Sequence, residues 1–188
     1  MSFESLEGQK FGLLSIDPPW KFKAGHSARS TENHYPTMTI PEIKALDIKS
    51  LAAPDCALFM WTTPPFLALS IDVLRAWQFR YVSVAFTWVK LRKSHRDALF
   101  LDGDMFVGLG HTTRKSSELC LLAKRGKPKR LDRNVHEIIF AARREHSRKP
   151  DEAARRMEKL YPGPKLEIFA RTSRPGWTAW GNETGKFK

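Results

Sequence analysis

The residues whose types and spacing most clearly suggest a chemical role stand at positions 17–20, where Asp17, Pro18, Pro19 and Trp20 follow an apolar run. A carboxylate accepts hydrogen bonds, and neither proline has an N–H, so we expect the nearby carbonyl oxygens to be free to accept as well. Two adjacent acceptors suit an –NH₂ group, and the Trp20 ring could stack on a flat base. The motif therefore indicates a site for a nucleobase amino group, although a strand-ending turn with a packed tryptophan would look the same.

The neighbouring segments must position this motif. The apolar run at 11–16 predicts a buried strand that the prolines end. Further strands are predicted at 57–61, 81–89, 118–123, 135–140 and 166–170, and helices at 39–46, 66–77 and 150–160. This alternation predicts an α/β fold, with a mostly parallel central sheet and helices on both faces. Such sheets bind ligands at the carboxyl ends of their strands, where Asp17 stands.

Local patterns add detail. Thr39 and Glu42 have the spacing of a capping box, and Pro150 is expected at the first position of its helix. Alternation predicts that one face of the 81–89 strand carries Val82, Val84, Phe86 and Trp88. The polar segment 21–37 is predicted to be a long loop. We expect a single domain over 1–188, with its core at 10–184 and a loose tail at 185–188.

The positive charge is concentrated in one stretch of the chain. The net charge is +12, and residues 90–149 hold 16 basic and 7 acidic side chains, whereas residues 1–89 are neutral overall. A localised basic excess is typical of a partner that is a polyanion, most often nucleic acid, although a merely soluble basic protein is the alternative. The expected phosphate contacts are Arg92, Lys93, Arg96, Arg114, Lys115, Arg125, Lys127, Lys129 and Arg130.

Several classes of protein are disfavoured. No apolar run is long enough to span a membrane, and the first residues lack a secretory pattern. The only cysteines, Cys56 and Cys120, stand in apolar strands, and the six histidines lack the spacing of metal ligands. The usual dinucleotide, P-loop, serine-hydrolase and zinc-protease signatures are missing. We therefore expect no metal and a reducing cytoplasm.

A wider pattern emerges from eight short blocks that occur in one order. They are Asp17-Pro18-Pro19-Trp20, Tyr35-Pro36-Thr37-Met38, Leu58-Phe59-Met60-Trp61, Trp88-Val89-Lys90, Glu118-Leu119-Cys120-Leu121-Leu122, Ser147-Arg148-Lys149-Pro150-Asp151-Glu152, Leu166-Glu167-Ile168-Phe169-Ala170-Arg171 and Trp177-x-x-Trp180-Gly181-Asn182-Glu183. Together they resemble the MTA-70 (MT-A70) family of S-adenosylmethionine-dependent N(6)-adenine methyltransferases. The resemblance covers about residues 10–184, and the compact length is most similar to the small bacterial and phage branch.

The resemblance implies a Rossmann-like methyltransferase fold in which the catalytic motif precedes the cofactor motif. Within the motif Asp17-Pro18-Pro19-Trp20, Asp17 and the Pro18 carbonyl would hold the adenine amino group, and Trp20 would line the base pocket. The residues that would cover or surround the target nucleoside, or connect it to the cofactor, are Tyr35, Lys90, Glu118, Ser147 and Lys149.

The resemblance also implies a binding site for S-adenosylmethionine, made by Asp17, Lys149, Glu167, Arg171, Ser173, Asn182 and Glu183. Asn182 and Glu183 suit ribose hydroxyls. Lys149 would pair with the methionine carboxylate or with an acidic neighbour such as Glu167, which needs a partner inside its apolar strand. Asp17 could also accept from the methionine ammonium.

This chain departs from the eukaryotic relatives in three places. Those relatives have an additional segment before the first strand that contributes to the adenine end of the cofactor site, whereas only residues 1–10 precede it here. The stretch from Arg171 to Trp177 is slightly shorter, which leaves Thr172 and Ser173 as candidates for the methionine end. Glu183 stands where the eukaryotic enzyme has an amide.

The expected mechanism is positioning followed by direct in-line displacement, because an aspartate is normally too weak a base to deprotonate an aromatic amine. DNA is the favoured substrate. RNA and a non-catalytic nucleic-acid-binding role are the alternatives, and nothing in the residues distinguishes a 2′-hydroxyl. Relatives act as monomers, homodimers or heterodimers, which leaves a homodimer or an accessory subunit open.

Overall fold

A computed structural model describes residues 2–21, 37–93, 102–108, 112–145 and 147–186 of the chain. Seven strands form one sheet in the order β5-β3-β4-β2-β1-β6-β7. Their bounds are β1 Phe11–Ile16, β2 Ala52–Thr62, β3 Arg80–Leu91, β4 Ser117–Arg125, β5 Ile138–Ala142, β6 Lys165–Ile168 and β7 Trp177–Trp180. The helices are α1 Ile40–Lys44, α2 Ile48–Leu51, α3 Leu67–Ala76 and α4 Asp151–Leu160, with 3₁₀ turns η1 Glu4–Leu6, η3 Pro64–Phe66 and η4 Asp102–Asp104.

One strand of the sheet runs against all the others. β1 is parallel to β2 and β6, β6 to β7, and β3 to β5, whereas β4 is antiparallel to both β2 and β3. The six other strands therefore end at one edge, which we call the carboxyl edge, and β4 begins there. β4 ends at the opposite, amino edge. The predicted α/β fold with a mostly parallel sheet is confirmed.

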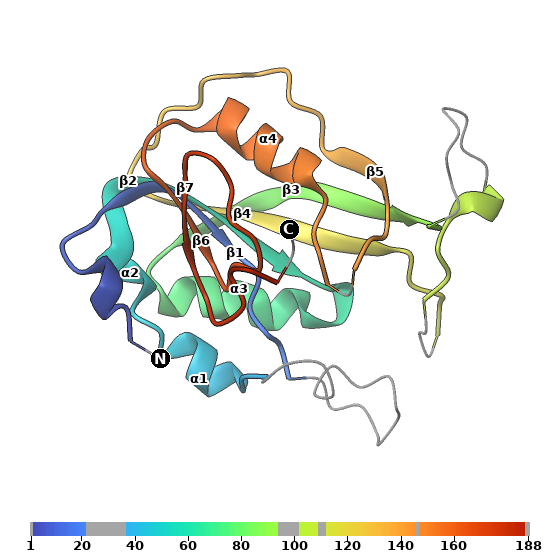
Figure 1. Cartoon of the computed structure of the whole chain (residues 1–188), viewed down its shortest axis with the longest axis horizontal. Helices are drawn as coiled ribbons and strands as arrows, with labels where there is room; N and C mark the ends of the chain where they lie inside the picture. Colours follow the sequence, from blue (N-terminus) through green and yellow to red (C-terminus); the bar gives the residue numbers. More distant parts are fainter. Residues whose placement is uncertain (1, 22–36, 94–101, 109–111, 146, 187–188) are drawn as a thin grey trace.

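Helices cover both faces of the sheet. One apolar core packs under α1, α2 and α3, and it buries Ile43, Ile48 and Leu74 completely. The other lies under α4 and includes Phe59, Phe86 and Met157. Figure 1 shows α4 on one side of the sheet, with α1 and α3 on the other. Burial of such side chains, at about 1.5–3 kcal/mol each, supplies the main driving force for this layered arrangement.

Most predicted elements occur where the patterns placed them. The capping box is confirmed, because the Thr39 side chain accepts from the Glu42 N–H while the Glu42 carboxylate accepts from the Thr39 N–H. The helix expected at 150–160 is α4, but Pro150 is its N-cap and not its first residue. The strand expected at 135–140 is β5, at Ile138–Ala142. β7 was not predicted, because a strand of four residues is too short to show a clear hydrophobic pattern.

The prediction of a uniform face for β3 is wrong. Val84 packs in the core under α1 to α3, Phe86 and Trp88 pack under α4, and Val82 is exposed. The register with β4 shifts between Tyr81 and Ser83 and again between Val84 and Phe86. Each shift is a bulge that adds one residue, and this changes which side the following residues face.

Candidate active site

Strand alternation brings the predicted chemical groups to the α4 face at the carboxyl edge. Lys90 follows Trp88 by two residues in β3, and Glu118 precedes Cys120 by two in β4. Both Trp88 and Cys120 belong to the core under α4. Asp17 follows the last residue of β1. Side chains two apart in a strand share a face, so three strands direct polar groups toward the same space.

The Asp17–Trp20 loop is held by the chain on both sides. The Pro18 carbonyl accepts the Trp20 N–H and the Pro19 carbonyl accepts the Met38 N–H, each at 2.8 Å. The expectation that these carbonyls are free is therefore wrong, because Met38 forms a bridge with Trp20 beside the loop. Each carbonyl oxygen keeps a second lone pair, so the Pro18 oxygen can still accept one further hydrogen bond.

Trp20 is a fixed part of the wall of the site. Its side chain is buried, its Nε1 donates to the Trp61 carbonyl at 3.2 Å, and its ring stacks on Phe66 with 5.5 Å between centroids. These contacts leave the ring little freedom to turn onto a ligand. Trp20 therefore shapes the space next to Asp17.

Four charged side chains form an alternating chain across the site. Lys149 Nζ lies 2.7 Å from Asp17 Oδ2 and 3.3 Å from Glu118 Oε2, and Lys90 Nζ lies 2.5 Å from Glu118 Oε1. All four are largely shielded, with side-chain exposures between 14% and 24%. We call this set the lysine chain. Because Lys149 holds only one oxygen of Asp17, the other oxygen can accept from a ligand.

Glu118 is the centre of the lysine chain. Burial raises the pKa of its carboxyl, but the charges of Lys149 and Lys90 and their hydrogen bonds lower it more. The pKa of Glu118 therefore lies below its ordinary value, and the group is a permanent anion at neutral pH. Its charge fixes both lysines at the end of the sheet.

The lysine chain lines a hollow of about 410 Å³, a size typical of a small-molecule site. Eight of the residues that the sequence singled out lie together in its wall: Asp17, Pro18, Trp20, Lys90, Lys93, Glu118, Ser147 and Lys149. Trp88, Thr62 and Thr63 add flat and hydroxyl-bearing surface. Among the described residues, the buried Thr63 hydroxyl has no hydrogen-bond partner. The hollow thus combines aromatic walls with acceptors beside Asp17, which suits a planar base.

A second, smaller hollow of about 30 Å³ lies on the other side of the same wall. It shares Asp17, Ser147, Arg148 and Lys149 with the large hollow, and Glu167 and Arg171 line it as well. Ser147 has a positive φ of 64°, so the segment that separates the two hollows turns in a conformation unusual for a non-glycine residue. Asp17 and Lys149 therefore face two neighbouring spaces.

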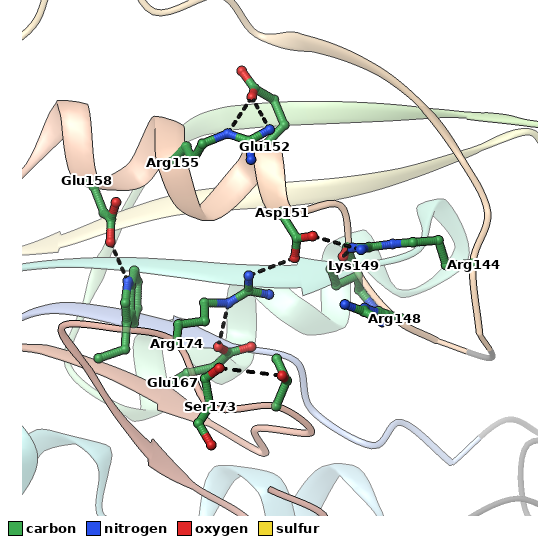
Figure 2. A network of polar contacts seen from close by, with 12 residues as sticks. Arg144, Arg148, Lys149, Asp151, Glu152, Arg155, Glu158, Glu167, Ser173 and Arg174 are labelled. Atoms are coloured by element: carbon green, nitrogen blue, oxygen red, sulfur yellow. Dashed lines mark hydrogen bonds and ion pairs between the residues drawn. The ribbon is translucent and has the colours of Figure 1, made fainter. Parts of the chain in front are cut away.

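An arginine that the sequence analysis did not single out spans the second hollow. Arg174 binds Asp151 Oδ1 with Nη1 at 2.7 Å and Glu167 Oε2 with Nε at 3.2 Å. Arg144 binds the other oxygen of Asp151 at 2.7 Å, as Figure 2 shows. We call these four residues the arginine chain. The predicted partner of Glu167 is thus supplied by Arg174, and the Lys149 ammonium binds Asp17 and Glu118.

The pKa values within the arginine chain differ in direction. Burial raises the pKa of the Glu167 carboxyl even though Arg174 pairs with it. Hydrogen bonds from Arg144 and Arg174 hold the pKa of Asp151 far below its usual range. Asp151 is therefore the well-compensated anion, whereas Glu167 retains part of the cost of its burial.

The remaining predicted cofactor residues lie on either side of β7, with Arg171 and Ser173 before it and Asn182 and Glu183 after it. Arg171 Nε is 3.5 Å from Glu183 Oε2, and Glu183 also pairs with Lys186. Lys186, within the tail predicted to be loose, thus has a defined contact. Asn182 and Ser173 are exposed.

These residues fit S-adenosylmethionine by their chemistry. Anions and a cation are available for an amino-acid end, and Asn182 and Glu183 are available for ribose hydroxyls. The 30 Å³ hollow, however, holds only about one water molecule. A bound cofactor therefore requires side chains that line this hollow to move.

The predicted phosphate contacts divide between the two edges of the sheet. Arg92, Lys93, Arg114 and Lys115 are exposed on the segment between β3 and β4, which projects past the carboxyl edge (Figure 1). We call this segment between β3 and β4 the projecting arm. Its described part is joined to β3, because Phe106 N donates to the Lys90 carbonyl at 2.7 Å. The other four, Arg125, Lys127, Lys129 and Arg130, lie at the amino edge. Tyr35 and Arg96 fall outside the described residues.

The structure adds residues that sequence reasoning missed. Arg143 lies over the Phe106 ring at 3.4 Å, and both Arg143 and Arg144 line the large hollow. A basic pair directly after a strand was a usable signal for a site at the carboxyl edge. Thr63 carried no such signal, because a single threonine before two prolines is equally typical of an ordinary turn. In the described part of the chain, no group of three or more metal-ligating side chains occurs.

A Rossmann-like methyltransferase is the class of protein that this arrangement defines, with one reversed strand, helices on both faces and paired hollows at the carboxyl edge. Comparison with known proteins makes the class specific. A profile of the MT-A70 family matches residues 11–183. The chain therefore belongs to the MT-A70 family and is a methyltransferase.

Relatives of the chain fall in two groups by length. The type II methyltransferase M.MunI of Mycoplasma is 34% identical over 96% of this chain and 81% of its own length. The N(6)-adenosine-methyltransferase MT-A70-like protein of Arabidopsis thaliana is 33% identical over 92% of this chain and 24% of its own. The human N(6)-adenosine-methyltransferase catalytic subunit METTL3 is 31% identical over 93% of this chain and 28% of its own. The chain thus spans most of the bacterial relative and about a quarter of the eukaryotic ones.

Proposed function

We propose that this protein transfers a methyl group from S-adenosylmethionine to the exocyclic N(6) amine of adenine in DNA. The observation that carries the proposal is that Asp17 and Lys149 stand in the wall between the two hollows. The larger hollow has the volume and aromatic walls for a base, and the smaller one has the charges for the cofactor. The names of the eukaryotic relatives support the N(6) position.

The structure supports positioning as the source of the rate. The free oxygen of Asp17 and the second lone pair of the Pro18 carbonyl accept the two N–H groups of the amine. This directs the nitrogen lone pair toward the smaller hollow. Lys149 holds Asp17 in this orientation through its 2.7 Å contact. The proton leaves the nitrogen after transfer, to Asp17 or to water.

The cofactor site proposed here uses the groups around the smaller hollow. S-adenosylmethionine, when bound, supplies an electrophilic methyl group. Lys149 and Arg174 are the cations available to its carboxylate, Asp17 and Glu167 are the anions available to its ammonium, and Asn182 and Glu183 are available to its ribose. Arg171 orients Glu183 through their ion pair.

The projecting arm is proposed to hold the target strand. Its cations Arg92, Lys93, Arg114 and Lys115 are exposed, and Lys93 also lines the large hollow, so phosphates of the target would lie along this arm. A base inside a duplex must flip out to enter the hollow, and a single-stranded base enters at lower cost. We infer DNA as the polymer because the match to the type II methyltransferase is 34% identical and extends over 81% of that protein, whereas the N(6)-adenosine-methyltransferases are matched over about a quarter of theirs. A cytoplasmic location follows from that same likeness to a bacterial methyltransferase.

The test is mass spectrometry of nucleosides after incubation with deuterated S-adenosylmethionine. Single- and double-stranded DNA and RNA are offered separately to the wild type, to Asp17→Ala and to the control Asp72→Ala, which removes an exposed aspartate of α3. We expect labelled N(6)-methyldeoxyadenosine from the wild type and the control and none from Asp17→Ala. Label found only in RNA would identify RNA, and not DNA, as the substrate. No label in any polymer, together with no binding of S-adenosylmethionine by calorimetry, would overturn the proposed function.

A further inference from the structure

The basic residues that are continuous in sequence form two separate surfaces. β4 starts at the carboxyl edge with Ser117 and carries the chain to Arg125 at the amino edge, where β2 begins. Glu118 and Arg125 are seven residues apart in this strand, which corresponds to about 24 Å at 3.4 Å per residue. A phosphate bound by the projecting arm therefore cannot also contact the cations that follow β4.

The cations at the amino edge converge from several elements. Lys10, before β1, donates to the Ser50 carbonyl, and Arg125 NH1 donates to the Lys49 carbonyl at 3.0 Å. Arg80 opens β3 opposite Lys124 of β4. We call this set the amino-edge basic surface: Lys10, Lys49, Arg80, Arg125, Lys127, Lys129 and Arg130.

The turn that presents three of these cations is held rigidly. Gly126 has a φ of +63°, and a Cβ there would lie 2.2 Å from Asp55 Oδ1 and 2.3 Å from the Pro54 carbonyl oxygen. Asp55 Oδ1 accepts the Lys127 N–H at 2.7 Å, and the Leu131 N–H donates to the Leu160 carbonyl at 2.9 Å. The turn is thus fixed at both ends, and the exposed side chains at 127, 129 and 130 project from a defined backbone.

The amino-edge cations lack anionic partners within the described chain. None of the seven is in an ion pair there, whereas Lys90, Lys149 and Arg174 at the carboxyl edge all pair with carboxylates. The nearby Asp47, Asp55 and Asp132 accept backbone N–H groups from Ser50, Lys127 and Asn134 respectively. The positive charge of this surface is therefore available to an external polyanion.

We propose that the amino-edge basic surface binds the phosphate backbone of a second segment of nucleic acid, while the carboxyl edge holds the segment with the target base. The identity of the polyanion rests on the proposed function. Its consequence is that one molecule bridges two duplexes. A short duplex is a straight rod, because the persistence length of DNA is about 150 bp, and it cannot wrap from one edge to the other.

A bridging assay tests this without the cofactor. One 30-bp duplex is attached to beads, and a second, fluorescent 30-bp duplex is free in solution. The fluorescent duplex is captured on the beads only if the protein binds both duplexes at once. The variant Lys127→Glu/Lys129→Glu/Arg130→Glu is compared with Arg114→Glu/Lys115→Glu, which reverses the arm. We expect the first variant to capture at least about tenfold less duplex. For a 60-bp duplex, the logarithm of the binding constant falls linearly with the logarithm of the salt concentration. We expect the magnitude of this slope to be smaller by about 2.7 in the first variant, because each lost phosphate contact removes about 0.9.

Methylation of a 12-bp duplex distinguishes the two edges. Under saturating enzyme the amino-edge variant is expected to transfer methyl groups within about twofold of the wild type, and the arm variant far more slowly. The neutral variant Lys127→Gln/Lys129→Gln/Arg130→Gln, with thermal unfolding of all forms, separates lost charge from lost fold. If the wild type bridges duplexes but methylates none, the proposed function is wrong, and the assignment of the amino-edge basic surface to nucleic-acid binding still stands.

Three results would overturn the inference. The first is bridging that persists in the amino-edge variant, which would assign it to self-association, as sedimentation velocity would show. The second is an equal loss of 12-bp methylation in both variants, which would make the two surfaces one site. The third is unchanged DNA binding together with lost binding to phosphatidylserine vesicles, which would make the partner a lipid surface.

Discussion

Two ion-pair chains meet at the carboxyl edge, and they are built from different cations. The lysine chain faces the 410 Å³ hollow, and each ammonium in it is a compact charge on a flexible stem. The arginine chain connects the last strands to α4, because the single guanidinium of Arg174 binds Glu167 and Asp151 together. The planar fork of Arg174 holds its two carboxylates in a fixed geometry, whereas the Lys149 ammonium, which also contacts two carboxylates, can adapt to a ligand.

The difference separates two tasks within one site. In the lysine chain, Asp17 keeps an oxygen for a ligand, and its partner Lys149 also faces the second hollow. In the arginine chain, both oxygens of Asp151 are occupied by arginines. We therefore expect a change of Asp17 to affect catalysis most, and changes of Glu118 or of the arginine chain to affect stability most.

The largest expected effect is that of Asp17→Ala, which removes the acceptor that both hollows share. The rate of methyl transfer should fall by about 10³-fold, as expected when a preorganised polar group at the reacting atom is lost. Single-turnover transfer with the labelled cofactor measures it, and Asp72→Ala is the matched control. A variant that keeps more than a tenth of the wild-type rate would place the essential acceptor elsewhere.

Glu118→Gln breaks the lysine chain at its centre. It leaves two shielded ammonium groups with less compensation, so we expect the free energy of unfolding at pH 7 to fall by about 3 kcal/mol. Because the folded pKa of Glu118 is lowered, its contribution is present above the ordinary value of 4.5 and is lost as pH falls through the folded value. Urea unfolding at pH 7 and about pH 3 should therefore show the two proteins converging in acid. A constant difference would mean that Glu118 acts by packing alone.

Arg174→Met and Arg174→Lys test whether the arginine chain depends on the fork. Removal of the guanidinium leaves Glu167 and one oxygen of Asp151 unpaired, and we expect about 2 kcal/mol of destabilisation. Lysine should restore less than half of this, because one ammonium cannot match both contacts of the planar group. Thermal unfolding of the two variants measures the effect. Full rescue by lysine would show that only the charge matters, and the contrast between the two chains would disappear.

The smallest effect concerns the two buried thiols, Cys56 in the core under α1 to α3 and Cys120 in the core under α4. Burial raises the pKa of Cys56 to about 12, and burial also raises the pKa of Cys120 well above its usual value, even though Lys149 opposes the shift. Neither thiol should react with a disulfide reagent at pH 8 in the folded protein, and both should react in denaturant. Fast labelling of Cys120 alone would show that the lysine chain activates it.

The sequence was most informative where the chemistry is local. The prolines after Asp17 predicted both the end of β1 and a site at the carboxyl edge, and Thr39 with Glu42 predicted the start of α1. Pairings across large sequence separations were beyond the same reasoning. Asp17 and Lys149 are 132 residues apart, and the residues alone left the partner of Lys149 open.

Two other features depend on three-dimensional context. The basic stretch at 90–149 has no mark at the point where it changes edges, because only the antiparallel pairing of β4 carries its middle part to the amino edge. Arg174 lies in an unremarkable polar segment. Its only signal was indirect, since Glu167 within an apolar strand required a cation.

The bulges of β3 also bear on which changes in chain length the protein can tolerate. Val82 and Ala85 are each one residue more than the ladder with β4 requires, so they resemble insertions that the sheet has absorbed. We expect that loss of either residue would leave every other residue opposite its present partner, with Lys90 still beside Glu118. Loss of Thr87, which is paired in the ladder, would instead shift one side of the strand by a residue and turn its side chains to the wrong face. Length variation among related chains should therefore gather at these two positions.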